Sequence, residues 1–275
     1  MKQRLLKPWL CALGITATTS LTADVEIAKR SPNIVVIMAD DMGYGDAACY
    51  NPNSKIPTPH LDQMAREGMR FTDAHTPSSV CSPTRYGLLT GRYPWRTEMK
   101  NGVLGAWAYP LIEKSRLTLA SMLKQHDYHT ACIGKWHLGW DWKTADGTPL
   151  NISRDAKHEA RVKQAAAVDY TQPLGGGPLG AGFDYYFGDG IINQPPYMWI
   201  ENNRCLTQPT EPLLKTIGKG SSNGAATPGW DQAKVLPRIA EKAVQYIHDR
   251  AQEKDIPFLL YFPLSAPHVP VMPTQ

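Results

Sequence analysis

The chain has 275 residues, of which 42% are hydrophobic and 20% are charged, with 22 glycines and 23 prolines. This length supports one large domain, or one and a fraction, that folds without disulfide bonds, and the hydrophobic content excludes a disordered protein. The net charge of +4 includes Lys2, Arg4 and Lys7, so residues 24–275 carry only +1. We therefore expect no nucleic-acid partner, because such a protein needs a clustered basic face.

Residues 1–23 have the layout of a secretory signal peptide. Three basic residues come first, a short run of apolar and small residues starts at Leu10, and Leu-Thr-Ala ends the segment at Ala23. The run is too short for a stable membrane span, and a disordered or amphipathic tail is the alternative interpretation. We expect cleavage near Ala23 and export to the periplasm or the medium, or to the lysosome or extracellular space of a eukaryote.

Four cysteines follow this segment: Cys49, Cys81, Cys132 and Cys205. No spacing among them matches a zinc-binding or C-x-x-C pattern, so the sequence predicts neither a disulfide framework nor a zinc site. We interpret three of them as ordinary buried thiols and Cys81 as a special case.

The rest of the sequence alternates strand patterns with helix patterns. Residues 33–39 (NIVVIMA) form a β-branched apolar run, which is typical of a strand buried on both faces. Strands are expected at 33–39, 69–74, 130–133 and 257–262, and helices at 59–67, 82–90, 119–126 and 237–251. Residues 140–182 are expected to form a long loop, with TQPLGGGPLGAG (171–182) as its least structured part. This alternation predicts an α/β fold around a largely parallel sheet, whose active crevice lies beyond the carboxyl ends of the strands.

Polar clusters follow three of these strands, and a fourth cluster opens a helix. They are Asp40 with Asp41, Lys135 with His137 (in GKWHLG), His268 (in SAPHVP), and the segment 81–85 (CSPTR). Each has an ordinary explanation alone: a turn, a scaffolding histidine or a solvated lysine. Their joint position at the mouth of one sheet predicts a functional site.

The CSPTR segment combines a nucleophile with an anion cradle. The free N–H groups at a helix start favour an anion, and the planar donors of Arg85 suit a tetrahedral oxyanion. Cysteine phosphatases place Cys and Arg six positions apart, and the residue six after Cys81 is Gly87, so that class is excluded. The nearby paired carboxylates suit a hard cation such as Ca²⁺, for which a thiolate is a poor ligand. If Cys81 belongs to this site, oxygen should have replaced its sulfur.

Long segments of the chain resemble type I sulfatases. CSPTRYGLLTG (81–91) is similar to the first signature of that family, and YHTACIGKWHLG (128–139) is similar to the second, with Asp127 where Gly usually precedes Tyr. The segments PNIVVIMADDMGYGD and TPHLDQMAREGMRFTDAHT also resemble the family, so the likeness covers nearly all of 32–275. It implies an alkaline-phosphatase-like α/β/α sandwich with a largely parallel mixed sheet.

The resemblance also implies an activity, that of a sulfuric ester hydrolase of the arylsulfatase type. In that family a formylglycine-generating enzyme converts the signature cysteine, here Cys81, to formylglycine. The gem-diol of this group attacks sulfur beside one Ca²⁺ or similar ion, for which the implied ligands here are Asp40, Asp41 and Cys81. The expected substrate is a sulfated small molecule or a sulfated carbohydrate.

The family's other roles carry over by position. Arg85 would hold the gem-diol, and Lys135 would contact the sulfate oxygens and stabilise charge in the transition state. His137 would take a proton during sulfate release, and His268 is a candidate acid for the leaving group.

The sequence departs from the family pattern in one respect. The family completes its metal shell with a later Asp-Asn or Asp-His pair, and no such dipeptide occurs before Gln275. We therefore expect residues 24–275 to be the incomplete N-terminal portion of a catalytic domain, without the C-terminal subdomain, with an unpaired sheet edge and little activity alone. The alternatives are a phosphomonoesterase or phosphonate hydrolase of the same superfamily, and an inactive anion- or glycan-binding fragment in which Cys81 stays a thiol.

Overall fold

The computed structural model describes residues 31–150, 152, 164–213 and 220–273. The chain divides into two units, 1–31 and 32–275, and every element named below belongs to the second. The expected signal segment, residues 1–23, lies outside the described residues. Among the helices of the described ranges, none combines the length and the apolar character needed to cross a membrane.

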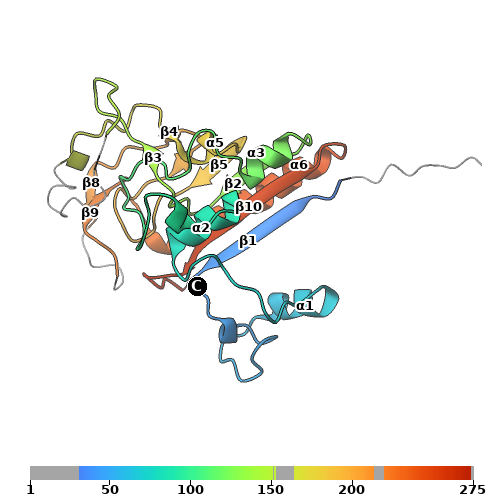
Figure 1. Ribbon diagram of the computed structural model, residues 1–275. Helices are drawn as coiled ribbons and strands as arrows, with labels where there is room; N and C mark the ends of the chain where they lie inside the picture. The colour runs from blue at the N-terminus through green and yellow to red at the C-terminus, as the bar shows by residue number, and fades with distance from the viewer. Residues whose placement is uncertain (1–30, 151, 153–163, 214–219, 274–275) are drawn as a thin grey trace, which may run out of the picture. The chain divides into compact units, whose positions relative to one another are not determined.

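A six-stranded sheet forms the centre of this unit, in the order β1-β10-β2-β5-β6-β7. Its strands are β1 (Ile34–Asp40), β2 (His129–Ile133), β5 (Tyr185–Gly188), β6 (Ile200–Glu201), β7 (Arg204–Cys205) and β10 (Phe258–Pro267). The first four strands in this order pair in parallel and the last two pairings are antiparallel, so the sheet is largely parallel and mixed, as the sequence predicted. Figure 1 shows β1 in blue alongside β10 in red.

Helices lie on both faces of this sheet. The described helices are α1 (Pro59–Glu67), α2 (Cys81–Thr90), α3 (Leu119–Lys124), α5 (Gly177–Gly180) and α6 (Val235–Gln252). Alternate residues of a strand point to opposite faces, and Cys132 and Leu259 join a core with α2 and α3, whereas Ala131 and Leu260 join a second core with α6. The α/β/α layering expected from the sequence is therefore confirmed.

Four helices begin and end close to the positions that their capping signals indicate. Thr118 accepts a hydrogen bond from the Ser121 amide at the start of α3, and Gly91 ends α2 with a φ of 63°, a backbone conformation that glycine adopts without strain. Helix α2 begins at Cys81, one residue before the predicted start at residue 82. Two small antiparallel sheets of two strands each pair β3 (Trp140–Asp141) with β4 (Gly175–Gly176) and β8 (Glu211–Leu213) with β9 (Gly224–Ala226). Three short 3-10 helices, η1 (Tyr44–Asp46), η2 (Pro94–Arg96) and η3 (Gln232–Lys234), complete the described elements.

The expectation that the first strand is buried on both faces is wrong. Within the described residues β1 pairs with β10 alone, so it is an edge strand. Val35 and Ile37 on its outer face are 45% and 56% exposed, while Val36 on the other face packs against the core. Helix α6, which covers that outer face further along the sheet, packs on β10, β2 and β5.

The strand expected at 69–74 is absent. These residues are extended or bent and pair with no strand of the described chain, and Met69 and Phe71 are largely exposed. A β-propensity run without a neighbouring strand has no ladder to join, so its backbone stays irregular.

The glycine-rich stretch 171–182 is more ordered than the sequence suggested. Gly175–Gly176 pair with Trp140–Asp141, and Gly177–Gly180 form α5. Gly177 has a φ of 60°, and a Cβ there would lie 2.1 Å from the Trp140 ring. The glycines therefore permit close packing rather than disorder. Residues 151 and 153–163 of the expected loop lie outside the described residues.

Candidate active site

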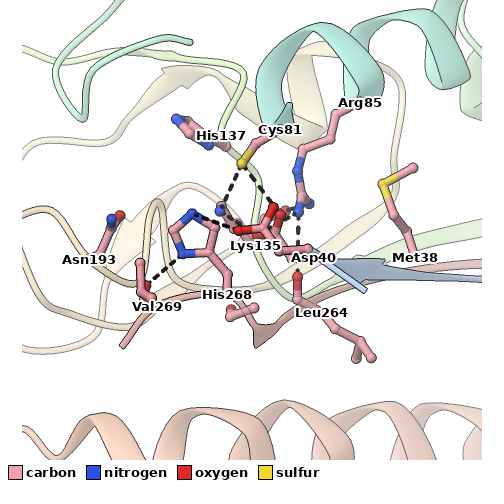
Figure 2. A network of polar contacts seen from close by, with 12 residues as sticks. Met38, Asp40, Cys81, Arg85, Lys135, His137, Asn193, Leu264, His268 and Val269 are labelled. Carbon is pink, nitrogen blue, oxygen red and sulfur yellow. Dashed lines mark hydrogen bonds and ion pairs between the residues drawn. The ribbon is translucent and has the colours of Figure 1, made fainter. Parts of the chain in front are cut away.

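The sheet brings the polar clusters together at one edge. Asp40 ends β1, Lys135 and His137 follow β2, and His268 follows β10, while Cys81 opens α2. The three strands are parallel neighbours, so their carboxyl ends meet at the same edge of the sheet. Figure 2 shows these side chains gathered around the Asp40 carboxylate.

Asp40 is the centre of this cluster. Its Oδ2 pairs with the Lys135 ammonium and lies 3.3 Å from Nη2 of Arg85, and the Cys81 thiol donates to its Oδ1 at 3.4 Å. Nζ of Lys135 is also 3.5 Å from the sulfur of Cys81. Asp40, Arg85 and Lys135 are all buried, so these charges interact with little screening by water.

Burial and charge act in opposite directions on Asp40. Burial by itself raises the pKa of the carboxyl, but the positive charges of Lys135 and Arg85 outweigh it, and the net effect lowers the pKa. Burial raises the pKa of the Cys81 thiol, and the charge of Asp40 adds to that effect while Lys135 opposes it. The site therefore holds an ionised carboxylate next to a protonated thiol, which is a weak nucleophile.

Arg85 is fixed between two strand ends. Its Nη1 donates to the carbonyl of Lys135 at 2.7 Å and its Nη2 reaches the carbonyl of Leu264 at 3.4 Å. Nε is buried without a partner among the described residues. The guanidinium therefore keeps unused donor capacity in the site.

Hydrogen bonds from four successive amides hold the segment Gly134–His137 in place. In chain order they reach the carbonyls of Phe187, Pro263, Asp189 and Gly190, at 2.8, 2.9, 3.3 and 3.2 Å. Gly134 has a φ of 128°, and a Cβ there would lie 2.1 Å from the carbonyl oxygen of Pro263. Backbone packing against β10 and against the residues after β5 thus decides where Lys135 and His137 point.

His137 is a buried neutral imidazole. Its Nε2 lies 2.8 Å from the carbonyl oxygen of Leu104, and because a carbonyl can only accept, Nε2 carries the proton. Nδ1 then has a lone pair, and it has no partner among the described residues. Burial lowers the pKa of His137 well below its ordinary value, and the charge of Lys135 adds to this. Nδ1 is therefore unprotonated and free to accept, although the lowered pKa makes it a weak base.

The grouping of candidate metal ligands differs from the set expected from sequence. Asp40, Cys81 and His268 each offer a ligand atom, and these atoms lie within 4.8 Å of one another. Asp41 has a φ of 67° and a half-exposed side chain, and its Oδ2 lies 3.6 Å from Nε2 of His268. His268 donates from Nδ1 to the carbonyl of Val269 at 2.6 Å, which turns Nε2 toward Asp41.

The donor chemistry of this group fits a hard divalent cation in part. The carboxylate of Asp40, within this group, and that of Asp41, outside it, are oxygen donors of the kind that Ca²⁺ prefers. The sulfur of Cys81 is a soft donor and does not suit such an ion. The set becomes consistent when position 81 offers oxygen.

Sequence reasoning missed Asp189. This residue directly follows β5, the fourth parallel strand, and is only 2% exposed. Ser265 donates to its Oδ1 at 3.5 Å, and Oδ2 has no partner in the described chain. Burial raises the pKa of Asp189 to about 6 against the opposing charges of Lys135 and Arg85. The signal was the aromatic run Tyr185–Phe187 ending in Gly-Asp, which predicts a strand end.

Comparisons with known proteins agree with the motifs. A family model described as Sulfatase matches residues 32–275. An N-acetylgalactosamine-6-O-sulfatase of Bacteroides thetaiotaomicron is 29% identical over 283 residues, covering 89% of this chain and 50% of the relative. Human arylsulfatase A is 48% identical over 254 residues, covering 91% and 44%.

One solved structure comes from work on the metabolism of multiple glycosaminoglycans by Bacteroides thetaiotaomicron. It has a TM-score of 0.68 to this chain at 29% identity, and the match covers 89% of this chain and 53% of that one. The chain spans about half the length of the curated relatives it matches.

Proposed function

Because this chain belongs to the sulfatase family, we propose that it supplies catalytic machinery of a sulfuric ester hydrolase that cleaves a sulfate monoester. Its fold is alkaline-phosphatase-like, as the sequence predicted. One observation supports the activity above all others: Cys81 of the first signature contacts both Asp40 at a strand end and Lys135 of the second signature.

Position 81 is the proposed site of the nucleophile. Conversion of Cys81 to formylglycine by a formylglycine-generating enzyme would supply an oxygen nucleophile where the encoded residue carries sulfur. Two things support this proposal: the CSPTR signature, and the Asp40 carboxylate in contact with Cys81, since a sulfur donor suits a hard-cation site poorly.

A divalent cation, Ca²⁺ by preference, belongs to the same proposal. Asp40, Asp41 and the oxygen at position 81 would hold it, and when bound it supplies a positive charge that favours the deprotonated nucleophile. Nε2 of His268 faces the Asp41 carboxylate and would help to orient it.

The remaining side chains bind the anion and move protons. Lys135 and Arg85 place two buried positive charges beside position 81, where the sulfate oxygens would lie, and such preorganised charges stabilise a developing anion. His137 presents an unprotonated Nδ1 and would accept the proton released as sulfate departs. His268 is the proposed acid for the leaving oxygen.

We further propose that the chain is exported, on the strength of the signal-like layout of residues 1–23. The substrate class is a sulfated small molecule or a sulfated carbohydrate. The relatives named above, one an N-acetylgalactosamine-6-O-sulfatase and the other an arylsulfatase, support testing a sugar sulfate and an aryl sulfate side by side.

The deciding experiment is the mass of the peptide that contains Cys81. The 275-residue chain is co-expressed with a formylglycine-generating enzyme, and the peptide mass is measured in the wild type and in Cys205→Ser, a control that changes a cysteine outside the site. We expect a peptide lighter than the cysteine form in both proteins. An unmodified Cys81 would reject the mechanism and leave the anion-binding alternative.

Hydrolysis separates the two enzyme classes. Rates on a chromogenic aryl sulfate, on N-acetylgalactosamine 6-sulfate and on the matched aryl phosphate are measured in the same preparation, with Cys81→Ala as the inactive reference. We expect low rates, because residues 24–275 alone are expected to have little activity, with the sulfate esters preferred and all turnover lost in Cys81→Ala. A preference for the phosphate ester would favour a phosphomonoesterase instead.

A further inference from the structure

The loop that carries Lys135 and His137 is held from two sides. The amide of Lys135 binds the carbonyl of Pro263 in β10, and the amides of Trp136 and His137 bind carbonyls of the two residues that follow β5. In the sheet β2 lies between β10 and β5, so these two supports stand on opposite sides of the strand from which the loop emerges.

Within the described part of the chain, one side-chain hydrogen bond joins the two supports. Oγ of Ser265, in β10, donates to Oδ1 of Asp189, which follows β5, at 3.5 Å. Both residues are buried, and the bond crosses the end of β2. The main-chain carbonyl of Asp189 already binds the Trp136 amide and the hydroxyl of Tyr186, at 3.3 and 3.0 Å. Asp189 therefore bonds to the loop with its backbone and to β10 with its carboxylate.

The carboxylate is costly at this position. It is buried, its Oδ2 has no partner among the described residues, and an uncompensated polar atom in a protein interior destabilises the fold. The neighbouring side-chain donor that it meets is a serine hydroxyl rather than a cation, although the charges of Lys135 and Arg85 act on it. An apolar residue at this buried position would stabilise the fold more than a carboxylate does. We therefore expect Asp189 to have a function in the site.

We propose that Asp189 is a positioning residue for Lys135 and His137, acting through its bond to Ser265. The Ser265–Asp189 bridge fixes the distance between β10 and the residues after β5. At that distance, the loop between them places the Lys135 ammonium beside Asp40 and position 81. The inference rests on the proposed function for the identity of the anion, sulfate, that these residues bind. The bridge itself is independent of that identity.

Four variants of the 275-residue chain separate positioning from general stability. Ser265→Ala and Asp189→Ala break the bridge, and Asp189→Asn keeps an acceptor oxygen for Ser265. Thr130→Val is the matched control, because it also removes a buried hydroxyl that donates to an aspartate carboxylate, that of Asp184 at 3.0 Å, at the other end of β2.

Two readouts are taken: amide hydrogen exchange of residues 134–137, and the affinity of the chain for inorganic sulfate by calorimetry. In Ser265→Ala and Asp189→Ala, we expect amide exchange of residues 134–137 to be about tenfold faster and sulfate binding about tenfold weaker. This is the effect expected from the loss of one hydrogen bond to a charged group. Asp189→Asn should recover to within about threefold of the wild type, since one hydrogen bond is retained. Thr130→Val should leave both readouts at the wild-type level.

Unchanged exchange at 134–137 in Ser265→Ala and Asp189→Ala would overturn the proposal, and so would equal effects in Thr130→Val. Failure of Asp189→Asn to recover, in a folded protein, would also reject it. If Asp189→Ala does not fold, Ser265→Ala decides, because it removes one oxygen atom only. A wild-type chain that binds no sulfate would count against the proposed function, and the exchange measurement would still settle the positioning role.

Discussion

Asp189 leads to a second prediction, which concerns pH and stability. The pKa of this buried carboxyl is raised from 3.8 to about 6, with burial as the main cause. A raised pKa means that the folded chain binds a proton more tightly than the unfolded chain does. The stability that this group contributes is therefore complete below pH 3.8 and is lost as the pH rises through about 6.

The size of the effect follows from the same shift. One pKa unit corresponds to about 1.4 kcal/mol, so a rise from 3.8 to about 6 gives about 3 kcal/mol between low and high pH. Relaxation of the surrounding chain reduces this figure, and we expect about 2 kcal/mol. Asp189→Asn has no ionisable group there, so its free energy of unfolding relative to the wild type should rise by that amount from pH 4 to pH 8.

The assay is urea denaturation of both proteins at several pH values in this range. The test uses only how the difference in free energy of unfolding between variant and wild type changes with pH. Any pH-independent effect of the new amide on stability therefore cancels. Asp184→Asn is the control: the pKa of Asp184 is lowered despite burial, through Lys124 and Thr130, so that group titrates below the range and its difference should stay flat. A flat difference for Asp189→Asn as well would show that its carboxyl is hydrated and would refute the reasoning.

Three further predictions concern stability alone and are measured by urea denaturation. Gly177→Ala should cost about 2–4 kcal/mol, because the new Cβ would meet the Trp140 ring at 2.1 Å and the φ of 60° disfavours any side chain. Thr118→Ala should cost about 1 kcal/mol through loss of the cap of α3. Ile37→Lys should change stability by less than about 0.5 kcal/mol, since its side chain is exposed, whereas Leu260→Ala, on the buried neighbouring strand, should cost about 2–5 kcal/mol.

Each of these has a control within the chain. Gly180→Ala places a Cβ in open space and should be nearly neutral, so an equal loss there would contradict the packing argument for Gly177. Thr118→Ser retains the capping oxygen and should keep most of the stability lost in Thr118→Ala. A large loss for Ile37→Lys would show that the outer face of β1 is covered in solution.

Local chemistry was enough to predict much of this site. Capping residues such as Thr118 and Gly91 act within one helical turn, so their signals are visible in a short window of sequence. The polar residues at the strand ends were equally readable, because parallel strands end at one edge of a sheet whatever their order. Asp40, Cys81 and Lys135 were thus predicted to meet, and they do.

The remaining features depend on which segments become neighbours. The apolar run of β1 predicts a strand but cannot tell an edge from a centre, and Val35 and Ile37 are exposed because this strand pairs on one side only within the described chain. The sequence of the glycines at 175–177 predicts a loop, but in the structure they pack closely against Asp141, Pro110 and Trp140. The role of Asp189 depends on the order β10-β2-β5, which sets Ser265 across from it over the end of the strand between them. Sequence patterns report how a residue's chain neighbours behave, whereas these contacts join residues far apart along the chain, so only the folded arrangement could decide them.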